Sequence, residues 1–128
     1  MQHVFELMPF ENELVVLTLD AIAVEKVFQW IASKGGVPVS GLRMRIKSGK
    51  PTGMEIDGMP FDANHTYHVV TSSYLANGGS NLFFLDDSNI HKEYIGLKIR
   101  DAVIGHTRAL YSRKQFINPA LDMRIQYE

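Results

Sequence analysis

The chain contains no cysteine among its 128 residues. This absence excludes disulfides, thiolate metal sites and cysteine nucleophiles, but it suits an oxidising compartment as well as a reducing one. The chain also lacks an apolar run of the roughly 20 residues that a membrane-spanning helix needs, and it opens without the basic and apolar segments of a secretory signal. We therefore expect no membrane partner, and the residues themselves leave the localisation unknown.

An excess of charge of either sign is missing as well. Thirteen Lys and Arg residues stand against fourteen Asp and Glu residues, which gives a formal net charge of -1. No overall positive field draws the chain onto nucleic acid, so we expect no nucleic-acid partner. The sequence also contains no Gly-x-Ser-x-Gly elbow, phosphate-binding loop or His-Glu-x-x-His pattern. The commonest self-contained hydrolase and nucleoside-triphosphate chemistries therefore lack support.

The composition that is present, 45% hydrophobic and 21% charged residues, is that of an ordinary globular domain. Residues 1–128 are predicted to form a single domain around one core. Apolar periodicities of both the helical and the strand type occur along the chain. The predicted fold class is α+β, with a mixed β-sheet packed against two main helices.

Local signals place the individual elements. Asp20 is predicted to cap a helix that Gly35 and Gly36 bring to an end, and Asp57-Gly58 is a strong hairpin-turn dipeptide. The opening residues are strand-like, and residues 81–93 are predicted to form a surface loop or flap. Helices are predicted over residues 21–33 and 97–113, and strands over Glu13–Leu19, Leu42–Lys47, residues 53–56, Tyr67–Ser72 and residues 121–127.

Several polar clusters invite a functional interpretation that the pattern does not favour. His65 and His68 would point to opposite faces of a strand, so we predict no metal site there. The group around Asp86-Asp87 is typical of a solvated loop rather than a cation site. Arg43 and Arg45 alternate on one strand face, which is predicted to be solvated in preference to contacting a phosphate or a partner domain.

Three stretches, in this order, resemble the C-terminal domain of the 5'-nucleotidase and UDP-sugar hydrolase family. Order and spacing carry the resemblance, because each motif alone is weak. The stretches are Met8-Pro9-Phe10-Glu11-Asn12-Glu13-Leu14-Val15 with its continuation to Leu19, Val39-Ser40-Gly41-Leu42-Arg43, and Gly58-Met59-Pro60-Phe61-Asp62 with Thr66-Tyr67-His68-Val69-Val70-Thr71 and Tyr74-Leu75-Ala76-Asn77-Gly78-Gly79.

The resemblance implies that substrate binding and hydrolysis are carried out by separate domains. In that family this domain supplies the base and ribose pocket, while a separate N-terminal metallophosphoesterase domain holds two metal ions and hydrolyses the phosphate ester. It implies no catalytic residue, metal ligand or cofactor in this chain, with divalent metals in the absent catalytic domain. A nucleoside or nucleotide ligand is expected, with a metallophosphoesterase domain or chain as partner. Only the resemblance supports a periplasmic or cell-surface localisation.

The same resemblance assigns the substrate-binding residues. Tyr74 takes the place of one of two aromatic rings that sandwich the base, and residues 77–80 form the ribose-facing turn. A simpler interpretation makes Tyr74 a core aromatic, with the glycine pair needed only for φ > 0 and close backbone approach. The predicted substrate-binding residues are Tyr74, Asn77, Gly78, Gly79 and Ser80.

The chain departs from the family pattern in three ways. The second ring is expected near Gly35-Gly36-Val37, where no aromatic residue occurs, and the ribose-binding Asp is replaced by Ser80. The upstream Asn-Gly-Gly-Gly-Ile-Arg turn and Asn-x-Gly-Asn helix are absent. We therefore expect a domain incomplete at its N-terminal side, as a fragment or split gene in preference to a gene product reduced to its second half.

Two functions follow from these expectations. The first is the substrate-recognition domain of a 5'-nucleotidase-type phosphohydrolase whose hydrolysis is carried out elsewhere. The alternative is a degenerate, non-enzymatic interaction or oligomerisation domain that retains the fold. Because the strand at Glu13 lies so near the terminus, we also expect structure to be missing beside it, which would leave one edge of the sheet exposed and apolar and favour a homodimer or pairing with the absent segment.

Overall fold

The computed structural model describes residues 2–8 and 10–128, so Pro9 of the first motif lies outside the described residues. The chain divides into two compact units. The first unit comprises Met1–Thr18 and His68–Ala120, and the second comprises Leu19–Tyr67 and Leu121–Glu128. Both units are discontinuous in sequence, and the single domain expected over residues 1–128 stays a prediction.

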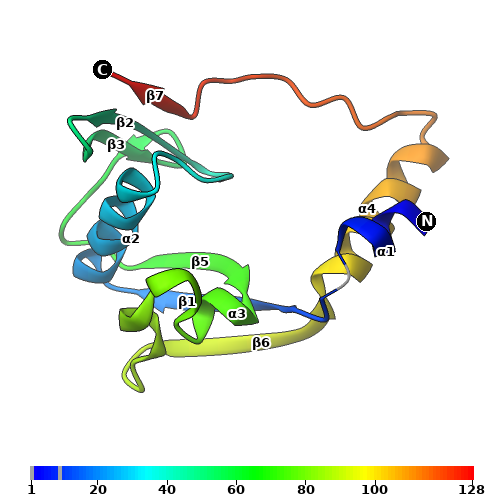
Figure 1. Cartoon of the computed structure of the whole chain (residues 1–128), viewed down its shortest axis with the longest axis horizontal. Coiled ribbons are helices and arrows are strands. Elements are labelled where there is room, and N and C mark those ends of the chain that lie inside the picture. Colours follow the sequence, from blue (N-terminus) through cyan, green and yellow to red (C-terminus); the bar gives the residue numbers. More distant parts are fainter. Residues whose placement is uncertain (1, 9) are drawn as a thin grey trace. The chain divides into compact units, whose positions relative to one another are not determined.

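The first unit is built on a three-stranded sheet with the order β5-β1-β6 (Figure 1). Its strands are β1 (Glu13–Leu19), β5 (Tyr67–Ser72) and β6 (His91–Lys98). The predicted bounds of β1 and β5 are confirmed. The side chains of Val15, Leu17 and Leu19 are buried while the alternate residues of β1 are half-buried, as expected for a strand with one covered face.

Two expectations about this sheet are wrong. β1 is the central strand and is hydrogen-bonded on both sides, so no structure is missing beside it, and the edges of this sheet are β5 and β6. The loop expected over residues 81–93 ends early, because β6 begins at His91 and pairs antiparallel with β1. A register shift opposite β1 and a positive φ of 75° at Gly96 interrupt the alternation that would have revealed β6 in the sequence.

Helices and 3-10 turns complete the first unit. They are α1 (Gln2–Leu7), α3 (Ser73–Ala76), the 3-10 turns η1 (Gly79–Asn81) and η2 (Phe83–Asp86), and α4 (Ile99–Ser112). The predicted second helix is confirmed as α4, with narrower bounds. The strand-like expectation for the opening residues is wrong, since α1 is helical and lies beside α4 in Figure 1. The Arg100 guanidinium carbon lies 4.3 Å from the centroid of the Phe5 ring, a cation–π contact that joins the two helices.

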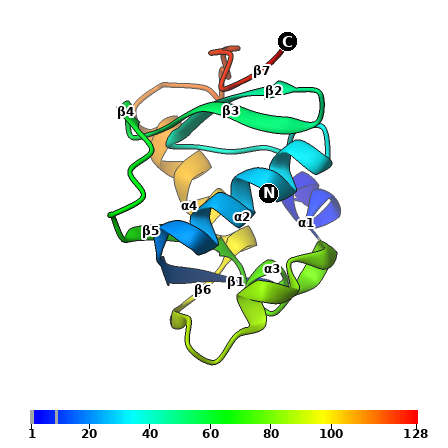
Figure 2. The ribbon, with the colours of Figure 1, turned by 90° about the vertical axis from the view of Figure 1, so that its left-hand side faces the viewer.

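The second unit packs one helix on a mixed sheet (Figure 2). Its strand order is β4-β3-β2-β7, from β2 (Leu42–Lys47), β3 (Lys50–Ile56), β4 (Met59–Pro60) and β7 (Ile125–Tyr127). Only β7 pairs in parallel, with β2. The helix α2 (Ala21–Ser33) contacts β3, and its N-cap is confirmed because Asp20 Oδ1 accepts a hydrogen bond from Ala23 N at 2.8 Å.

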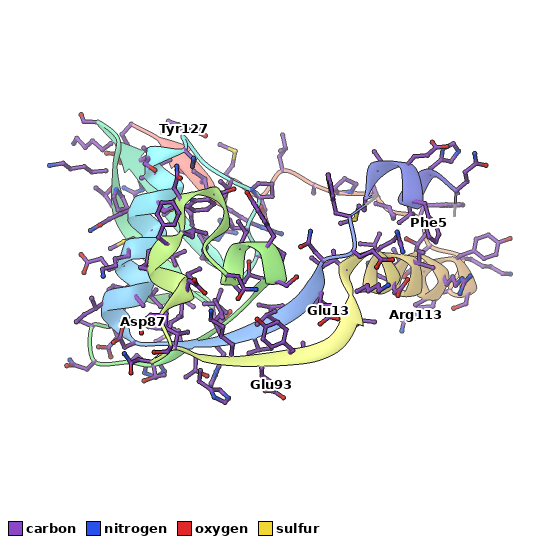
Figure 3. All side chains as sticks on the ribbon, turned by 60° about the horizontal axis from the view of Figure 1, so that its bottom comes forward. Phe5, Glu13, Asp87, Glu93, Arg113 and Tyr127 are labelled. Carbon is purple, nitrogen blue, oxygen red and sulfur yellow. The ribbon has the colours of Figure 1, made fainter. Side chains whose placement is uncertain are left out.

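The final strand is shorter than residues 121–127 because Met123 has a left-handed φ of 55° and only residues 125–127 pair with β2. The Tyr127 hydroxyl, labelled in Figure 3, donates to the Gly35 carbonyl oxygen. The face of β2 that was expected to be solvated is exposed, but its arginines also contact the C-terminal segment of the chain. Arg45 Nη1 lies 3.2 Å from Glu128 Oε1, and Arg43 Nη1 donates to the Asp122 carbonyl oxygen at 3.0 Å.

The α+β class and the mixed sheet are therefore confirmed, with the strands shared between two sheets rather than one. The buried side chains of the second unit come mainly from α2 and β2, and those of the first unit from β1, α3, α4 and the segment that follows α3. Among the described residues, no helix combines the length and apolarity that crossing a membrane requires.

Candidate functional site

The candidate site lies where β5 runs directly into α3. Ser72 is the N-cap of α3, and its Oγ accepts a hydrogen bond from Leu75 N at 3.2 Å. This cap turns the chain sharply at the end of the strand. Tyr74 therefore falls in the first turn of α3, where its side chain is 57% exposed. The tyrosine is not a core residue, so its ring is available for contact with a ligand.

The turn that follows α3 has an unusual backbone. Gly78 has φ = 93°, and Ser80 and Asn81 have left-handed φ values of 54° and 67°. Glycine adopts such angles without steric cost, whereas non-glycine residues held there cost on the order of 1–3 kcal/mol and tend to cluster at functional sites. The sequence-based expectation that the glycine pair supplies φ > 0 is confirmed at Gly78.

The second glycine allows a close approach between the turn and Tyr74. A Cβ atom at Gly79 would lie 2.6 Å from both Cε1 and Cζ of Tyr74, and 2.6 Å from the Tyr74 carbonyl oxygen. The Tyr74 hydroxyl accepts a hydrogen bond from Ser80 N at 3.3 Å. The hydroxyl end of the ring is therefore held against the turn by a contact that only glycine permits.

A shallow depression of about 470 Å³ lies beside this ring. It brings together four of the five predicted site residues, while Ser80 is exposed and reaches Tyr74 through its backbone. The depression is lined by Asn12, Ser73, Tyr74, Asn77, Gly78 and Gly79. Asn12 was not among the predicted site residues, although its place in the Phe10-Glu11-Asn12 motif was the signal that could have found it.

Hydrogen bonds fix the two asparagines of the depression. Ser73 Oγ accepts from Glu13 N at 3.1 Å and donates to Asn12 Oδ1 at 3.3 Å, which ties the start of β1 to the start of α3. The Tyr94 hydroxyl, on β6, donates to Asn77 Oδ1 at 3.2 Å. Figure 3 labels Glu13 where β1 begins. All three strands or their flanking residues thus contribute to the site.

The segment before β1 carries an exposed aromatic residue and a charged network. Phe10, two residues before Asn12, is 76% exposed. Next to it, Glu11 Oε1 lies 3.0 Å from Lys98 Nζ and 3.7 Å from Arg100 Nη2. The hydrogen bond from Lys98, aided by the positive charges of both bases, holds the pKa of the Glu11 carboxyl below its usual value.

The other polar clusters have local roles. Asp87 Oδ1 accepts hydrogen bonds from Asn89 N at 2.8 Å and from Asn89 Nδ2 at 2.9 Å, the geometry of an Asx turn. Asp86 Oδ1 lies 3.7 Å from Lys92 Nζ. His68 Nδ1, on β5, lies 3.3 Å from Thr18 Oγ1 on β1. Within residues 2–8 and 10–128, no group of three or more His, Asp or Glu side chains is arranged to hold a metal ion.

Solved structures share this fold. A 5'-nucleotidase precursor from Thermus thermophilus matches 97% of this chain with a TM-score of 0.81 and 24% identity. The NAD nucleotidase of Haemophilus influenzae matches 84% with a TM-score of 0.70 and 20% identity, and a sulfate thiohydrolase of Thermus thermophilus matches 93% with a TM-score of 0.55 and 17% identity. This chain covers 27%, 24% and 23% of those chains, respectively.

These likenesses define the fold as that of a module found within larger nucleotidase chains. Among curated proteins, none matches the chain significantly. The profile of the family described as "5'-nucleotidase, C-terminal domain" matches residues 1–87, which is more than half of the sequence and includes the whole of the candidate site up to Ser80. The chain belongs to this family, as the three ordered motifs predicted.

Proposed function

We propose that this chain is the nucleoside-recognition part of a 5'-nucleotidase-type phosphohydrolase. The observation that carries the proposal is the exposed Tyr74 ring, held against Gly79 beside a depression lined by Asn12 and Asn77. A purine or pyrimidine stacks on such a ring because every base presents a π-face, and each base–aromatic contact is worth about 1–3 kcal/mol. Gly78, Gly79 and Ser80 shape the edge of the site that faces the ribose, and Asn77 lines the depression beside the ring.

Phe10 is our candidate for the second ring. The sequence pattern put that ring near residues 35–37, where no aromatic occurs. In the first unit, Phe10 is 76% exposed and only two residues from Asn12, which lines the depression. An exposed aromatic side chain so close to the site supports a second stacking surface. Ser80 is expected to bind ribose more weakly than the Asp of the family pattern, because a neutral hydroxyl makes a weaker hydrogen bond than a carboxylate.

Hydrolysis is assigned to a domain or chain outside these residues. The names of the Thermus and Haemophilus neighbours, a 5'-nucleotidase precursor and an NAD nucleotidase, support a nucleotide substrate. A metallophosphoesterase partner would supply divalent metals that polarise the phosphoryl oxygens and activate water. On this proposal the chain alone hydrolyses no phosphate ester with any metal, and the family resemblance extends to a periplasmic or cell-surface setting.

Nucleoside titration tests this function directly. We expect adenosine and uridine to shift the NMR signals of Tyr74, Asn12 and Asn77 at submillimolar to millimolar concentration, while residues of the second unit serve as an internal control. Binding in this range is expected because the depression is shallow and one stacking contact is modest. Unchanged spectra with both nucleosides at concentrations well above this range would rule out the recognition role.

The alternative function, a degenerate interaction or oligomerisation domain, is favoured by one observation on the sheet. β5 is an edge strand without Lys, Arg, Asp, Glu, Pro or Gly, and its Val70 is 60% exposed. Natural edge strands are usually guarded by charges, proline or bulges. The opposite edge, β6, carries Lys92, Glu93, Lys98 and the Gly96 irregularity. A second copy of the chain is the partner that this self-complementary, uncharged edge would pair with.

Charge placed on β5 tests the homodimer. We expect Val70→Lys to convert a dimer into a monomer in light scattering, because a lysine on an edge strand blocks pairing between sheets. The matched control is Ile95→Lys on β6, where the native residue is 49% exposed and the charged residues of the strand already disfavour pairing with another sheet. A wild type that is monomeric at all accessible concentrations, or a dimer equally disrupted by both variants, would remove β5 as the interface.

A further inference from the structure

The amide groups of Asn12 and Asn77 have the same orientation toward their neighbours. Each carboxamide oxygen accepts a hydrogen bond from a hydroxyl: Asn12 Oδ1 from Ser73 Oγ at 3.3 Å, and Asn77 Oδ1 from Tyr94 at 3.2 Å. Neither amide nitrogen has a hydrogen-bond partner within the described part of the chain. Both side chains line the depression beside Tyr74. The side chains there are consequently arranged as donors.

Two hydroxyl groups donate to these amide oxygens. Ser73 Oγ accepts from Glu13 N at 3.1 Å, and the Ser73 hydroxyl donates its own proton to Asn12 Oδ1. The Tyr94 hydroxyl holds one proton, and Asn77 Oδ1 is its acceptor. Each carboxamide oxygen already accepts one hydrogen bond, whereas neither amide nitrogen has a partner among the described residues, so the groups that each asparagine has wholly free for a ligand are its N–H groups. No Asp or Glu is among the described residues that line the depression.

We infer that this site selects bases whose edge presents carbonyl oxygens, and that Tyr94 is a positioning residue for this selection. The inference rests on the proposed function and names its substrate class. Uridine and inosine carry a carbonyl oxygen where cytidine and adenosine carry an amino group. When a base amino group faces an asparagine N–H, both groups are donors and neither finds an acceptor. A base carbonyl oxygen in the same place accepts the hydrogen bond. Uridine is therefore preferred over cytidine, and inosine over adenosine.

The size of the preference follows from one hydrogen bond. A net hydrogen bond is worth roughly 0.5–1.5 kcal/mol, so each oxo nucleoside should bind about 2- to 12-fold more tightly than its amino counterpart. The members of each pair share stacking area almost completely, because they have the same ring and differ only in the oxo or amino group and in the proton on the neighbouring ring nitrogen. The ratio within a pair therefore reports the edge contact and cancels the contribution of Tyr74.

Tyr94→Phe tests the positioning role. Removing the hydroxyl frees Asn77 Oδ1, so the carboxamide can turn and offer either its oxygen or its nitrogen. We expect the oxo-over-amino ratio to fall well below the wild-type ratio, since only Asn12 is then still held as a donor, while the affinity for uridine changes less than about threefold. Tyr111→Phe, on α4, is the matched control, because Tyr111 is 78% exposed and far along the chain from the depression. That variant should keep the wild-type ratio.

Asn77→Asp provides a second test that does not depend on Tyr94. The carboxylate is the same shape as the amide but only accepts hydrogen bonds, so the preference should reverse in favour of cytidine and adenosine. Titrations of the full chain with the four nucleosides, followed by NMR, measure all three variants. Equal affinities within both wild-type pairs overturn the inference alone, whereas no binding of any nucleoside overturns the proposed function with it. An unchanged ratio in Tyr94→Phe removes Tyr94 from the mechanism.

Discussion

Replacing Tyr74 with alanine is expected to weaken nucleoside binding by about 5- to 150-fold. This range corresponds to the loss of one base–aromatic stacking contact of about 1–3 kcal/mol. The ring is 57% exposed, so its removal opens no cavity in a core and should leave the free energy of unfolding nearly unchanged. NMR titration with uridine and adenosine measures the affinity, and urea denaturation followed by circular dichroism measures the stability.

Tyr74→Phe is the control for this prediction. It keeps the aromatic face but removes the hydroxyl that accepts from Ser80 N, so affinity should stay within about threefold of wild type. Phe10→Ala asks whether a second ring contributes, and because two rings on one base share a partner, the loss in the double variant should differ from the sum of the two single losses if both rings stack on it. Equal affinity of wild type and Tyr74→Ala would contradict stacking at this ring. A loss of binding in Tyr74→Phe as large as in Tyr74→Ala would make the hydroxyl, not the ring, the binding group.

Elements with strong local signals could be predicted from the sequence. The helix α2 has an Asp20 N-cap and a glycine pair at its end, and both act through neighbouring residues. β1 and β2 have apolar positions that match their covered faces. In each case the signal lies within a few residues of the element it specifies, so no knowledge of the tertiary structure was needed.

Other elements depend on distant residues and could not be predicted. α1 is short, and its contacts to α4 join residues far apart in the sequence, including Phe5 and Arg100. Isolated helices of such length are not stable by propensity alone. β6 is paired to β1 across a long stretch of intervening chain, and its irregularity at Gly96 hides the period-two pattern. The division into two discontinuous units is likewise a property of long-range contacts.

The candidate site divides in the same way. Tyr74 and the glycine pair stand together in the sequence, and their motif was enough to single them out. Asn12 is distant in the sequence, and it lines the depression while bonded to Ser73, which also accepts from Glu13 N. The role of Tyr94 depends on the pairing of β6, which was itself not predicted. Residues that orient other residues are therefore the part of a site that sequence motifs reveal least.

Replacing Gly79 with alanine is expected to lower the free energy of unfolding by about 3 kcal/mol, the upper end of the usual cost of steric overpacking, which is about 1–3 kcal/mol. The new methyl group would lie 2.6 Å from the Tyr74 ring carbons and 2.6 Å from the Tyr74 carbonyl oxygen. The ring can rotate away, but the carbonyl belongs to the backbone of α3 and cannot move without distorting that helix. Urea denaturation followed by circular dichroism measures the change.

Gly105→Ala is the matched control, since it adds the same methyl group elsewhere in the first unit. Gly105 lies inside α4 and is exposed, and beyond its own stretch of helix a Cβ atom added there would meet no atom of the described residues within 4 Å. Alanine is favoured over glycine in a helix interior by roughly 1 kcal/mol, so this variant should be more stable than wild type. If Gly79→Ala lowers the free energy of unfolding and Gly105→Ala raises it, the strain lies at the turn under Tyr74. A neutral Gly79→Ala would mean that the turn and the ring are not in contact, and the stacking surface would then lack the support on which the proposed function depends.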